Sequence, residues 1–175
     1  ELEDLSFSVL NKPARELILD RLKFIKSNRE DTFKIISAEL IQLLKHNGIN
    51  ASITGREKTP FSIWRKIQNK KISLEQLTDI IGFRILVDSV EDCYKTLGVF
   101  HNKFSAIPGK FKDYISTPKI NKYKSIHTSV IGPKKNRIEI QIRTKDMNEF
   151  AERGIASHWK YKSSEKFSEL SWKAY

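Results

Sequence analysis

Cysteine is scarce in this sequence and long apolar runs are missing, and each shortage excludes a class of protein. A single cysteine in 175 residues excludes a disulfide framework and a zinc site built from several thiolates, and it indicates a reducing compartment. The longest apolar stretch, Ile80 to Val87, is interrupted by Arg84 and is far shorter than the ~20 residues of a membrane-spanning helix. We therefore predict a cytoplasmic protein with no membrane partner.

Two catalytic motifs are also missing. The sequence holds no Gly-x-x-x-x-Gly-Lys-Ser/Thr, which excludes a Walker-type P-loop, and no His-Asp dipeptide, which excludes a metal-dependent phosphohydrolase of that kind. The chain begins at Glu1, without a methionine or a signal-like segment, so we expect it to be a piece of a longer protein.

Positive charge, in contrast, is in excess. Lys and Arg total 32 against 21 Asp and Glu, a formal net charge of +11, and the 39% of hydrophobic residues suffice for the core of one ordinary domain. Such an excess points to a polyanionic partner, and nucleic acid, acidic lipid and nucleotide phosphates all qualify.

Helical and extended patterns are mixed without regular alternation, which predicts an α+β fold. Helices are expected in the first fifty residues, where the second ends at Gly48, and over 61–68, 89–104 and 144–156. Strands are expected over 51–54, 80–87, 125–131 and 137–143, and the last two form an antiparallel hairpin. The inner face of the 89–104 helix would carry Val90, Tyr94, Leu97 and Phe100, and that of the last helix Met147, Phe150 and Ala151.

The strand over 137–143 has the most informative polar pattern. Glu139, Gln141 and Arg143 alternate with isoleucines and so share one face, which is either a wet surface or the floor of a site. In a site, the carboxylate would hold Mg²⁺ or accept a hydroxyl proton, and the guanidinium would neutralise phosphate charge. His127 lies on the polar face of the neighbouring strand, although a lone strand histidine is more often structural than catalytic.

Two basic segments offer further contacts to phosphate. Gly55-Arg56-Glu57-Lys58 leads into a helix with Arg65 and Lys66, a junction where backbone N–H groups favour anions, unless the helix only exposes a basic face to water. Between Lys110 and Lys124, lysines are interleaved with tyrosines, a pattern that pairs phosphates and stacks a base, or else forms a solvated basic loop.

Asp79 stands directly before the buried strand that Arg84 interrupts. A charge inside an apolar strand is costly unless it is paired or serves a site. Asp79 with Glu139 would supply the carboxylates that Mg²⁺ uses beside phosphates, whereas Asp79 with Arg84 would be a structural ion pair. The residues alone leave both interpretations open.

Taken together, these segments resemble the synthetase domain of the Rel/SpoT homologues, the bacterial (p)ppGpp synthetases. The resemblance covers about Leu2 to Lys162 and rests on the order and spacing of Gly-Arg-Glu-Lys at 55–58, Ser-Ile-Trp-Arg-Lys at 62–66, Asp-Ile-Ile-Gly-Phe-Arg at 79–84, Pro-Gly-Lys-Phe-Lys-Asp-Tyr-Ile at 108–115, Asn-Lys-Tyr-Lys-Ser-Ile-His-Thr at 121–128, Glu-Ile-Gln-Ile-Arg-Thr at 139–144 and Ser-His-Trp at 157–159. It implies a nucleotidyltransferase-like fold, a mixed β-sheet flanked by helices. It also implies transfer of the β,γ-pyrophosphate of ATP to the 3′-hydroxyl of GDP or GTP, with release of AMP and with Mg²⁺ or Mn²⁺ as cofactor, in the stringent response.

The resemblance further implies a role for each matching residue. Asp79 and Glu139 would bind the metal, Glu139 would take the proton of the attacking hydroxyl, and Gln141 and Arg143 would support this floor. Arg56 and Arg84 would sandwich the adenine of ATP, and Lys58, Arg65 and Lys66 would hold its phosphates. The acceptor GDP or GTP would lie among Lys110, Lys112, Tyr114, Lys119, Asn121 and His127, with Tyr123 stacked on guanine.

One position departs from the pattern of bifunctional members, whose Arg-x-Lys-Asp is Lys-Phe-Lys-Asp at 110–113 here, so the charge is kept but the bidentate geometry is lost. We predict a linker and N-terminal helix over 1–28, the synthetase domain over 29–162 and a tail over 163–175. The family implies fusion to an N-terminal hydrolase domain and C-terminal regulatory domains, and a ribosome contact would explain the remaining basic residues. The alternatives are a basic RNA- or ribosome-binding domain and a catalytically silent regulatory domain of the same fold.

Overall fold

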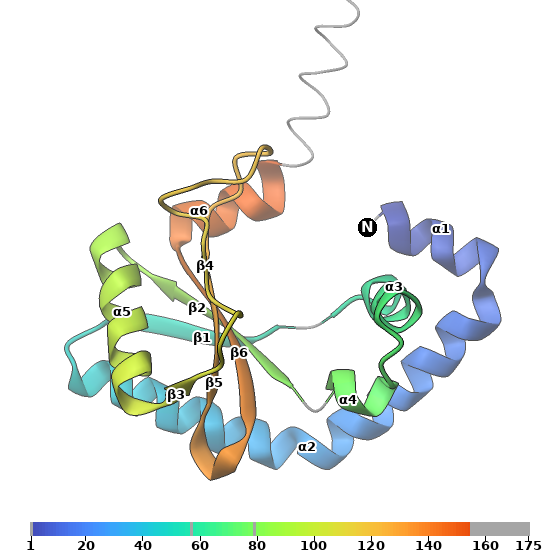
Figure 1. The fold of residues 1–175 in the computed structure, drawn as a ribbon, viewed down its shortest axis with the longest axis horizontal. Helices are drawn as coiled ribbons and strands as arrows, with labels where there is room; N and C mark the ends of the chain where they lie inside the picture. The colour runs from blue at the N-terminus through green and yellow to red at the C-terminus, as the bar shows by residue number, and fades with distance from the viewer. Residues whose placement is uncertain (1, 57, 79, 155–175) are drawn as a thin grey trace, which may run out of the picture.

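The computed structural model describes residues 2–56, 58–78 and 80–154, in which helices and strands follow one another in mixed order (Figure 1). The elements are α1 (Leu2–Leu10), α2 (Lys12–His46), β1 (Ala51–Gly55), α3 (Pro60–Lys70), α4 (Leu74–Thr78), β2 (Ile81–Val87), α5 (Val90–Lys103), β3 (Ser105–Ala106), β4 (Lys112–Asp113), β5 (Ile126–Ile131), the short turn η1 (Pro133–Lys135), β6 (Arg137–Thr144), α6 (Lys145–Glu149) and the π-helix η2 (Phe150–Gly154). The predicted α+β fold with a mixed sheet flanked by helices is confirmed.

A six-stranded sheet forms the centre of the fold. Its strands lie in the order β1-β2-β6-β5-β3, and β4 pairs with β5 off this path. Strands β2 and β6 are parallel, and the other described pairs are antiparallel, including the predicted hairpin of β5 and β6. Strand β6 is the last strand among the described residues, but it lies in the middle of the sheet, where β2 and β5 flank it.

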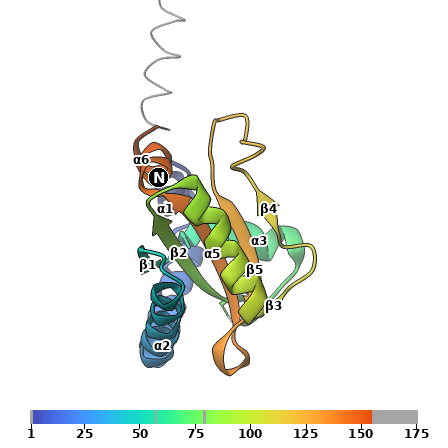
Figure 2. The ribbon, with the colours of Figure 1, turned by 90° about the vertical axis from the view of Figure 1, so that its left-hand side faces the viewer.

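Helices α2 and α5 cover one face of this sheet, and Figure 2 shows α5 in front of the strands. Their buried side chains, Ile36, Leu40 and Leu44 from α2 and Cys93 and Phe100 from α5, form one core with the apolar residues of β2, β5 and β6. Phe83 of β2 is paired with Ile140 of β6 in this core. Because side chains alternate along a strand, the residues between them face the other side of the sheet, and that side carries the candidate site.

The C-terminus of α2 is formed as predicted. Gly48 has a φ of +70°, and the amide of Ile49 donates to the carbonyl of Leu44 at 3.0 Å, which is a left-handed helix cap. Upstream, α2 is continuous across the position between residues 28 and 29 at which we divided a linker from the synthetase domain. The division itself stays a prediction, and the tail over 163–175 lies outside the described residues.

A second apolar cluster lies away from the main core, where α1, α3 and α4 pack against the N-terminal half of α2 (Figure 1). Its buried members are Phe7, Ile18, Ile63 and Leu77. Helix α3 begins as predicted at Pro60, after the Thr59 hydroxyl accepts a hydrogen bond from the Ser62 amide. Within the described residues, no helix has the length and apolar character needed to cross a membrane.

The predicted inner face of α5 is half right, because Phe100 is buried and Leu97 packs against the core, but Val90 and Tyr94 do not. The helix turns Cys93, Thr96 and Phe100 into the core, whereas Val90 and Tyr94 are 43% and 39% exposed. The small side chains of Cys93 and Thr96 allow α5 to pack closely on the sheet. The Tyr94 hydroxyl finds polar partners outside the core, where it donates to Asp113.

The last predicted helix begins as expected but changes its geometry. The Thr144 hydroxyl caps α6 by accepting from the Met147 amide, and after Glu149 the chain continues as the π-helix η2. The wider π-helical turn shifts the side chains that follow it relative to an α-helix. Phe150, predicted on the apolar side, is 37% exposed, and the predicted end of the helix at residue 156 lies outside the described residues.

Candidate active site

The open face of the sheet carries the polar row of β6. Strand pairing places Glu139 between Gly82 of β2 and Ser129 of β5, and it places Gln141 opposite His127. Directly paired residues share a face, so the polar residues of β5 and β6 lie on one face, a proximity that the sequence alone left open. The sheet thus supplies a floor with one carboxylate, one amide and one guanidinium in line.

Two cations hold the carboxylate of Glu139. Arg56 follows directly after β1, and its Nη1 donates to Oε1 of Glu139 at 2.9 Å. The Nζ of Lys58 lies 3.9 Å from the other oxygen, Oε2. Burial lowers the pKa of Lys58, Glu139 raises it, and the neighbouring cations Lys66 and Arg56 lower it further. This cluster therefore concentrates positive charge around a single acid.

Glycine at position 82 makes this approach geometrically feasible. The Arg56 amide donates to the Gly82 carbonyl at 2.8 Å, so the backbones of the two residues are in direct contact. A Cβ atom at Gly82 would lie 3.3 Å from both the Cβ and the carbonyl oxygen of Arg56, tighter than ordinary van der Waals contact. A side chain at this position would push Arg56 away from Glu139.

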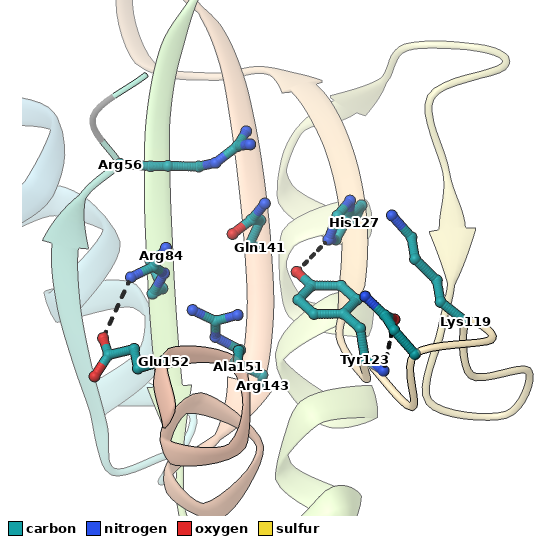
Figure 3. Close-up of a pocket in the computed structure, with 10 residues that line it drawn as sticks. Arg56, Arg84, Lys119, Tyr123, His127, Gln141, Arg143, Ala151 and Glu152 are labelled. Atoms are coloured by element: carbon teal, nitrogen blue, oxygen red, sulfur yellow. Dashed lines mark hydrogen bonds and ion pairs between the residues drawn. The ribbon is translucent and has the colours of Figure 1, made fainter. Parts of the chain in front are cut away.

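A cavity of about 370 Å³ opens beside these residues (Figure 3). One wall, which we call the arginine side, consists of Arg56, Arg84 and Arg143. Arg84 forms an ion pair at 3.8 Å with Glu152, which reaches the cavity from η2. Arg143 is 2% exposed, and its Nε has no hydrogen-bond partner among the described residues. Burial lowers the pKa of Arg143, and the nearby Arg84 lowers it further. This wall therefore carries positive charge that a bound anion would neutralise.

The opposite wall consists of Lys119, Tyr123 and His127, and Tyr114 packs against it; we call these four residues the tyrosine side. The Tyr123 hydroxyl is 2.9 Å from Nε2 of His127, and the Tyr114 ring meets the His127 ring edge-on at 5.2 Å. The Nζ of Lys119 lies 4.7 Å from the centre of the Tyr114 ring and 5.2 Å from that of Tyr123. These rings offer flat surfaces for a base, beside a cation for its phosphates.

His127 is uncharged at neutral pH in this environment. Burial, and then the cations Arg56 and Lys119, lower the pKa of His127 to about 4, although Glu139 acts in the opposite direction. A neutral imidazole both donates and accepts, and one of its nitrogens faces the Tyr123 hydroxyl. The histidine therefore orients polar groups here without adding to the positive charge.

The N-terminus of α3, expected to attract an anion, holds a carboxylate from this chain. Oδ1 of Asp4 accepts from the Phe61 amide at 3.3 Å, and Oδ2 accepts from Arg15 at 3.3 Å. Farther along α3, Arg65 is exposed and lies over the Phe61 ring, 5.8 Å from its centre. Lys66 acts on Lys58 electrostatically and so lies toward the cation cluster.

The structure gathers most of the predicted residues. Those that line the cavity are Arg56, Arg84, Lys119, Asn121, Tyr123, His127, Gln141 and Arg143, and Lys58, Tyr114 and Glu139 contact them. Arg65, Lys110 and Lys112 are exposed and do not line it, although Lys112 pairs with His127 between β4 and β5. Asp79, Glu57 and Ser157 to Trp159 lie outside the described residues.

Two residues of the cavity were not predicted as site residues. Ala151 and Glu152 line it from η2. We assigned Ala151 to the apolar side of a regular helix and gave Glu152 no role. The turn to π-helical geometry at Phe150 brings both to the cavity, and no apolar spacing in the sequence signals such a turn.

The side chains of the floor limit which metal ion could bind there. Among the described residues, no three or more His, Cys, Asp or Glu side chains come together as a ligand set. Mg²⁺ is commonly held by only one or two carboxylates, with substrate phosphates and water completing its shell. Glu139 fits that kind of site, because its carboxylate lies beside a cavity rich in phosphate-binding cations.

Comparison with known proteins decides the family. The family described as "Region found in RelA / SpoT proteins" matches residues 55–166, which include every strand of the sheet except part of the β1 edge. The chain belongs to the RelA/SpoT family. Among curated RelA/SpoT relatives, "GTP pyrophosphokinase rsh" of Brucella melitensis is 49% identical over 162 residues, which are 93% of this chain and 22% of that protein. The chain thus spans about a fifth of the length of the curated relatives it matches.

Solved structures agree with the RelA/SpoT assignment. The small alarmone synthetase 1 from Bacillus subtilis aligns with a TM-score of 0.59 and 27% identity, over 82% of this chain and 81% of that one. The same synthetase bound to its product pppGpp aligns with a TM-score of 0.55 and 28% identity over the same shares. The resemblance noted from the sequence motifs is therefore confirmed at the level of family and fold.

Proposed function

We propose that this RelA/SpoT chain is a (p)ppGpp synthetase domain, which transfers the β,γ-pyrophosphate of ATP to the 3′-hydroxyl of GDP or GTP and releases AMP. The observation that carries the proposal is the carboxylate of Glu139, held by Arg56 and Lys58 on the open face of the sheet, beside a cavity with a cationic wall and an aromatic wall. The names of the RelA/SpoT relatives and of the solved structures favour this activity over RNA binding or a silent regulatory domain.

The two walls suit two different nucleotides. On the arginine side, Arg56 and Arg84 would sandwich the adenine of ATP, while Lys58, Lys66 and Arg65 would bind its phosphates. On the tyrosine side, Tyr123 would stack on guanine. The other acceptor contacts proposed from the sequence are Lys110, Lys112, Tyr114, Lys119, Asn121 and His127. Two polyphosphates repel each other, so cations between them are needed to bring the reacting atoms together.

The proposed chemistry needs one proton acceptor and a fixed geometry. Glu139 takes the proton of the 3′-hydroxyl, whose oxygen attacks the β-phosphorus of ATP, and the bond from that phosphorus to the bridging oxygen of the α-phosphate breaks. For this role Arg56 must release Oε1 of Glu139, which it holds at 2.9 Å. Gln141 and Arg143 support the floor. Positioning alone can supply ~7–11 kcal/mol of a barrier, and the surrounding cations stabilise the charge on the transferred group.

We also propose Mg²⁺, or Mn²⁺, as cofactor, held by Glu139 and Asp79 together with the phosphates of ATP. When bound, such an ion neutralises charge on the transferred phosphoryl groups. The fit rests on the single accessible carboxylate of the floor, and the part of Asp79 rests on the sequence motif.

The whole protein is proposed to be longer and cytoplasmic, with a hydrolase domain before this one, regulatory domains after it and a ribosome contact. The small share of the curated relatives that the chain spans supports this proposal. So do the apolar side chains on α1, because Leu2, Leu5, Val9 and Leu10 are between 63% and 82% exposed.

Product formation from ATP, GDP and Mg²⁺ tests the proposal directly. The 175-residue chain should yield equal amounts of AMP and a pyrophosphorylated guanosine nucleotide. Glu139→Gln should lower the rate at least about 100-fold, since general bases contribute roughly that much, whereas the exposed Glu149→Gln should leave it unchanged. No product from the unaltered chain, or full activity in Glu139→Gln, would refute the proposed function.

A further inference from the structure

The carboxylate of Asp113 accepts four hydrogen bonds from other groups of the chain. Its Oδ1 accepts from the backbone amides of Ile115 at 2.9 Å and Ser116 at 3.0 Å. Its Oδ2 accepts from the Tyr94 hydroxyl at 2.9 Å and from the Ser116 hydroxyl. Both carboxylate oxygens are therefore engaged within the chain, and this acid is not available as a ligand for a metal or a nucleotide.

The partners of Asp113 belong to two different parts of the fold. Ile115 and Ser116 lie two and three residues after Asp113 and form a tight turn around its carboxylate, whereas Tyr94 lies on α5. The buried residues of α5, among them Phe100, fix that helix to the core. Because the ring of Tyr94 is 39% exposed, its hydroxyl serves the contact to Asp113 more than the packing of the core.

The segment that Asp113 anchors carries the tyrosine side. Strand β4 pairs Lys112 with His127, and the Tyr114 amide donates to the Ser125 carbonyl at 2.9 Å. Alternation along the strand places Asp113 on the side away from its neighbours Lys112 and Tyr114. The carboxylate of Asp113 thus binds Tyr94 of α5 on one side of the segment. On the other side, the ring of Tyr114 contacts His127 and Tyr123.

The negative charge of Asp113 strengthens the hydrogen bonds that its carboxylate accepts. Partial burial raises the pKa of Asp113, but hydrogen bonds from Ser116, Tyr94 and Ile115 outweigh burial and bring it below the usual value. Hydrogen bonds to an ionised acceptor are roughly twice as strong as neutral ones. The same contacts hold the turn after β4 in one conformation.

We infer that Asp113, through Tyr94 and Ser116, is the positioning residue of the tyrosine side: it ties the segment from Lys112 to Tyr123 to helix α5 and so places Tyr114, Lys119 and Tyr123 for the acceptor nucleotide. The inference rests on the proposed function for the identity of that nucleotide. It assigns Asp113 no contact with either substrate. Loosening the anchor should therefore weaken acceptor binding and leave the ATP half of the site unchanged.

Steady-state kinetics with each nucleotide varied in turn provides the test. Tyr94→Phe removes one exposed hydroxyl and should raise the KM for GDP about 3- to 10-fold, while Asp113→Ala should raise it at least about 30-fold, as expected for hydrogen bonds to a charged group. The KM for ATP and the kcat at saturating GDP should stay within about twofold. Ser116→Ala should resemble Tyr94→Phe, and Ser116→Thr, which keeps the hydroxyl, should restore the original KM.

Thr117→Ala is the matched control, because Thr117 is the exposed neighbour of Ser116 and the structure describes no hydrogen bond of its side chain. If Asp113→Ala does not fold, Tyr94→Phe and Ser116→Ala decide. An unchanged KM for GDP in those variants, or an equal rise in the KM for ATP, overturns the inference. If the unaltered chain makes no product, the proposed function fails, and the Kd of a fluorescent guanine nucleotide for the same variants tests the anchor separately.

Discussion

The two walls of the cavity are held in place by different forces. On the arginine side, Arg56 and Arg84 are 27% and 30% exposed at their side chains, and each is paired with a carboxylate of the chain, Glu139 and Glu152. On the tyrosine side, Lys119 lies over the rings of Tyr114 and Tyr123, and the structure describes no carboxylate beside it. One wall is thus set by ion pairs to Glu139 of β6 and Glu152 of η2, and the other by aromatic rings.

The difference indicates how each wall would respond to a ligand. An anionic group that binds on the arginine side must compete with the carboxylates of Glu139 and Glu152 for the arginines. A carboxylate that it displaces loses its ion pair and needs a new partner. A base on the tyrosine side meets flat aromatic surfaces and the ammonium group of Lys119. Binding there would replace cation–π contacts, which are weaker than ion pairs. Electrostatic changes should therefore have their largest effects on the arginine side.

Arg56→Ala should give the largest effect of the changes considered below. It removes a proposed adenine contact and leaves Glu139 with only Lys58 at 3.9 Å. We expect kcat/KM for ATP to fall at least about 100-fold, since loss of one member of a partly buried charge pair costs several kcal/mol. The KM for GDP should change little. Arg137→Ala, at an exposed position of the same sheet, is the control, and an equal loss toward both nucleotides would contradict the division into two walls.

Tyr123→Ala should give the next largest effect, and on the opposite substrate. Stacking of a base on an aromatic ring contributes about 1–3 kcal/mol, so the KM for GDP should rise by roughly 10- to 100-fold while the KM for ATP is kept. Tyr123→Phe preserves the ring and loses the hydroxyl's contacts to His127, at 2.9 Å, and to Arg143, so its effect should be several-fold smaller. A rise of similar size in both variants would show that the hydroxyl, not the stacking surface, matters.

The smallest expected effect concerns stability as a function of pH. In the folded chain the pKa of His127 is about 4, below its ordinary value of 6.5, so the unfolded chain binds more protons between these values. Stability should therefore fall as the pH drops from 6.5 toward 4, by about 1–2 kcal/mol at pH 5. Urea unfolding at pH 7.5 and 5 measures this loss.

The matched variants for that measurement are His127→Gln, which should lose most of the pH dependence, and His46→Gln at an exposed position of α2, which should keep it. Equal pH dependence in all three proteins would mean that His127 is not the group that titrates. Such a result would place the acid sensitivity outside the tyrosine side.

Periodicity predicted the parts of the site that lie on regular strands. The alternation of Glu139, Gln141 and Arg143 with isoleucines predicted their common face, and the hairpin of β5 and β6 was also predicted, but the register that places His127 opposite Gln141 came from the structure. Local signals also located the Thr59–Pro60 start of α3 and the Gly48 cap of α2. These features depend only on residues close in sequence.

Such local patterns could not predict contacts between segments that lie far apart in the sequence. Arg56 and Glu139 are 83 positions apart, and nothing local predicts that they pair. Tyr94 was placed on the inner face of its helix together with Val90, Leu97 and Phe100, but its hydroxyl donates to the carboxylate of Asp113 outside the core. Glu152 reaches the cavity only because η2 has a wider turn than an α-helix.

The central position of β6 has a consequence for how the protein is made. Of the strands that the structure describes, β6 is synthesised last, yet both β2 and β5 pair with it, and it carries Glu139. Such non-local pairing is formed slowly, after long loops have closed. On the ribosome, a nascent chain that ends before residue 137 has Arg56, Arg84 and the whole tyrosine side but lacks the strand that pairs with both β2 and β5. We expect no nucleotide chemistry from unfinished chains, so incomplete translation would leave no active fragment of this domain.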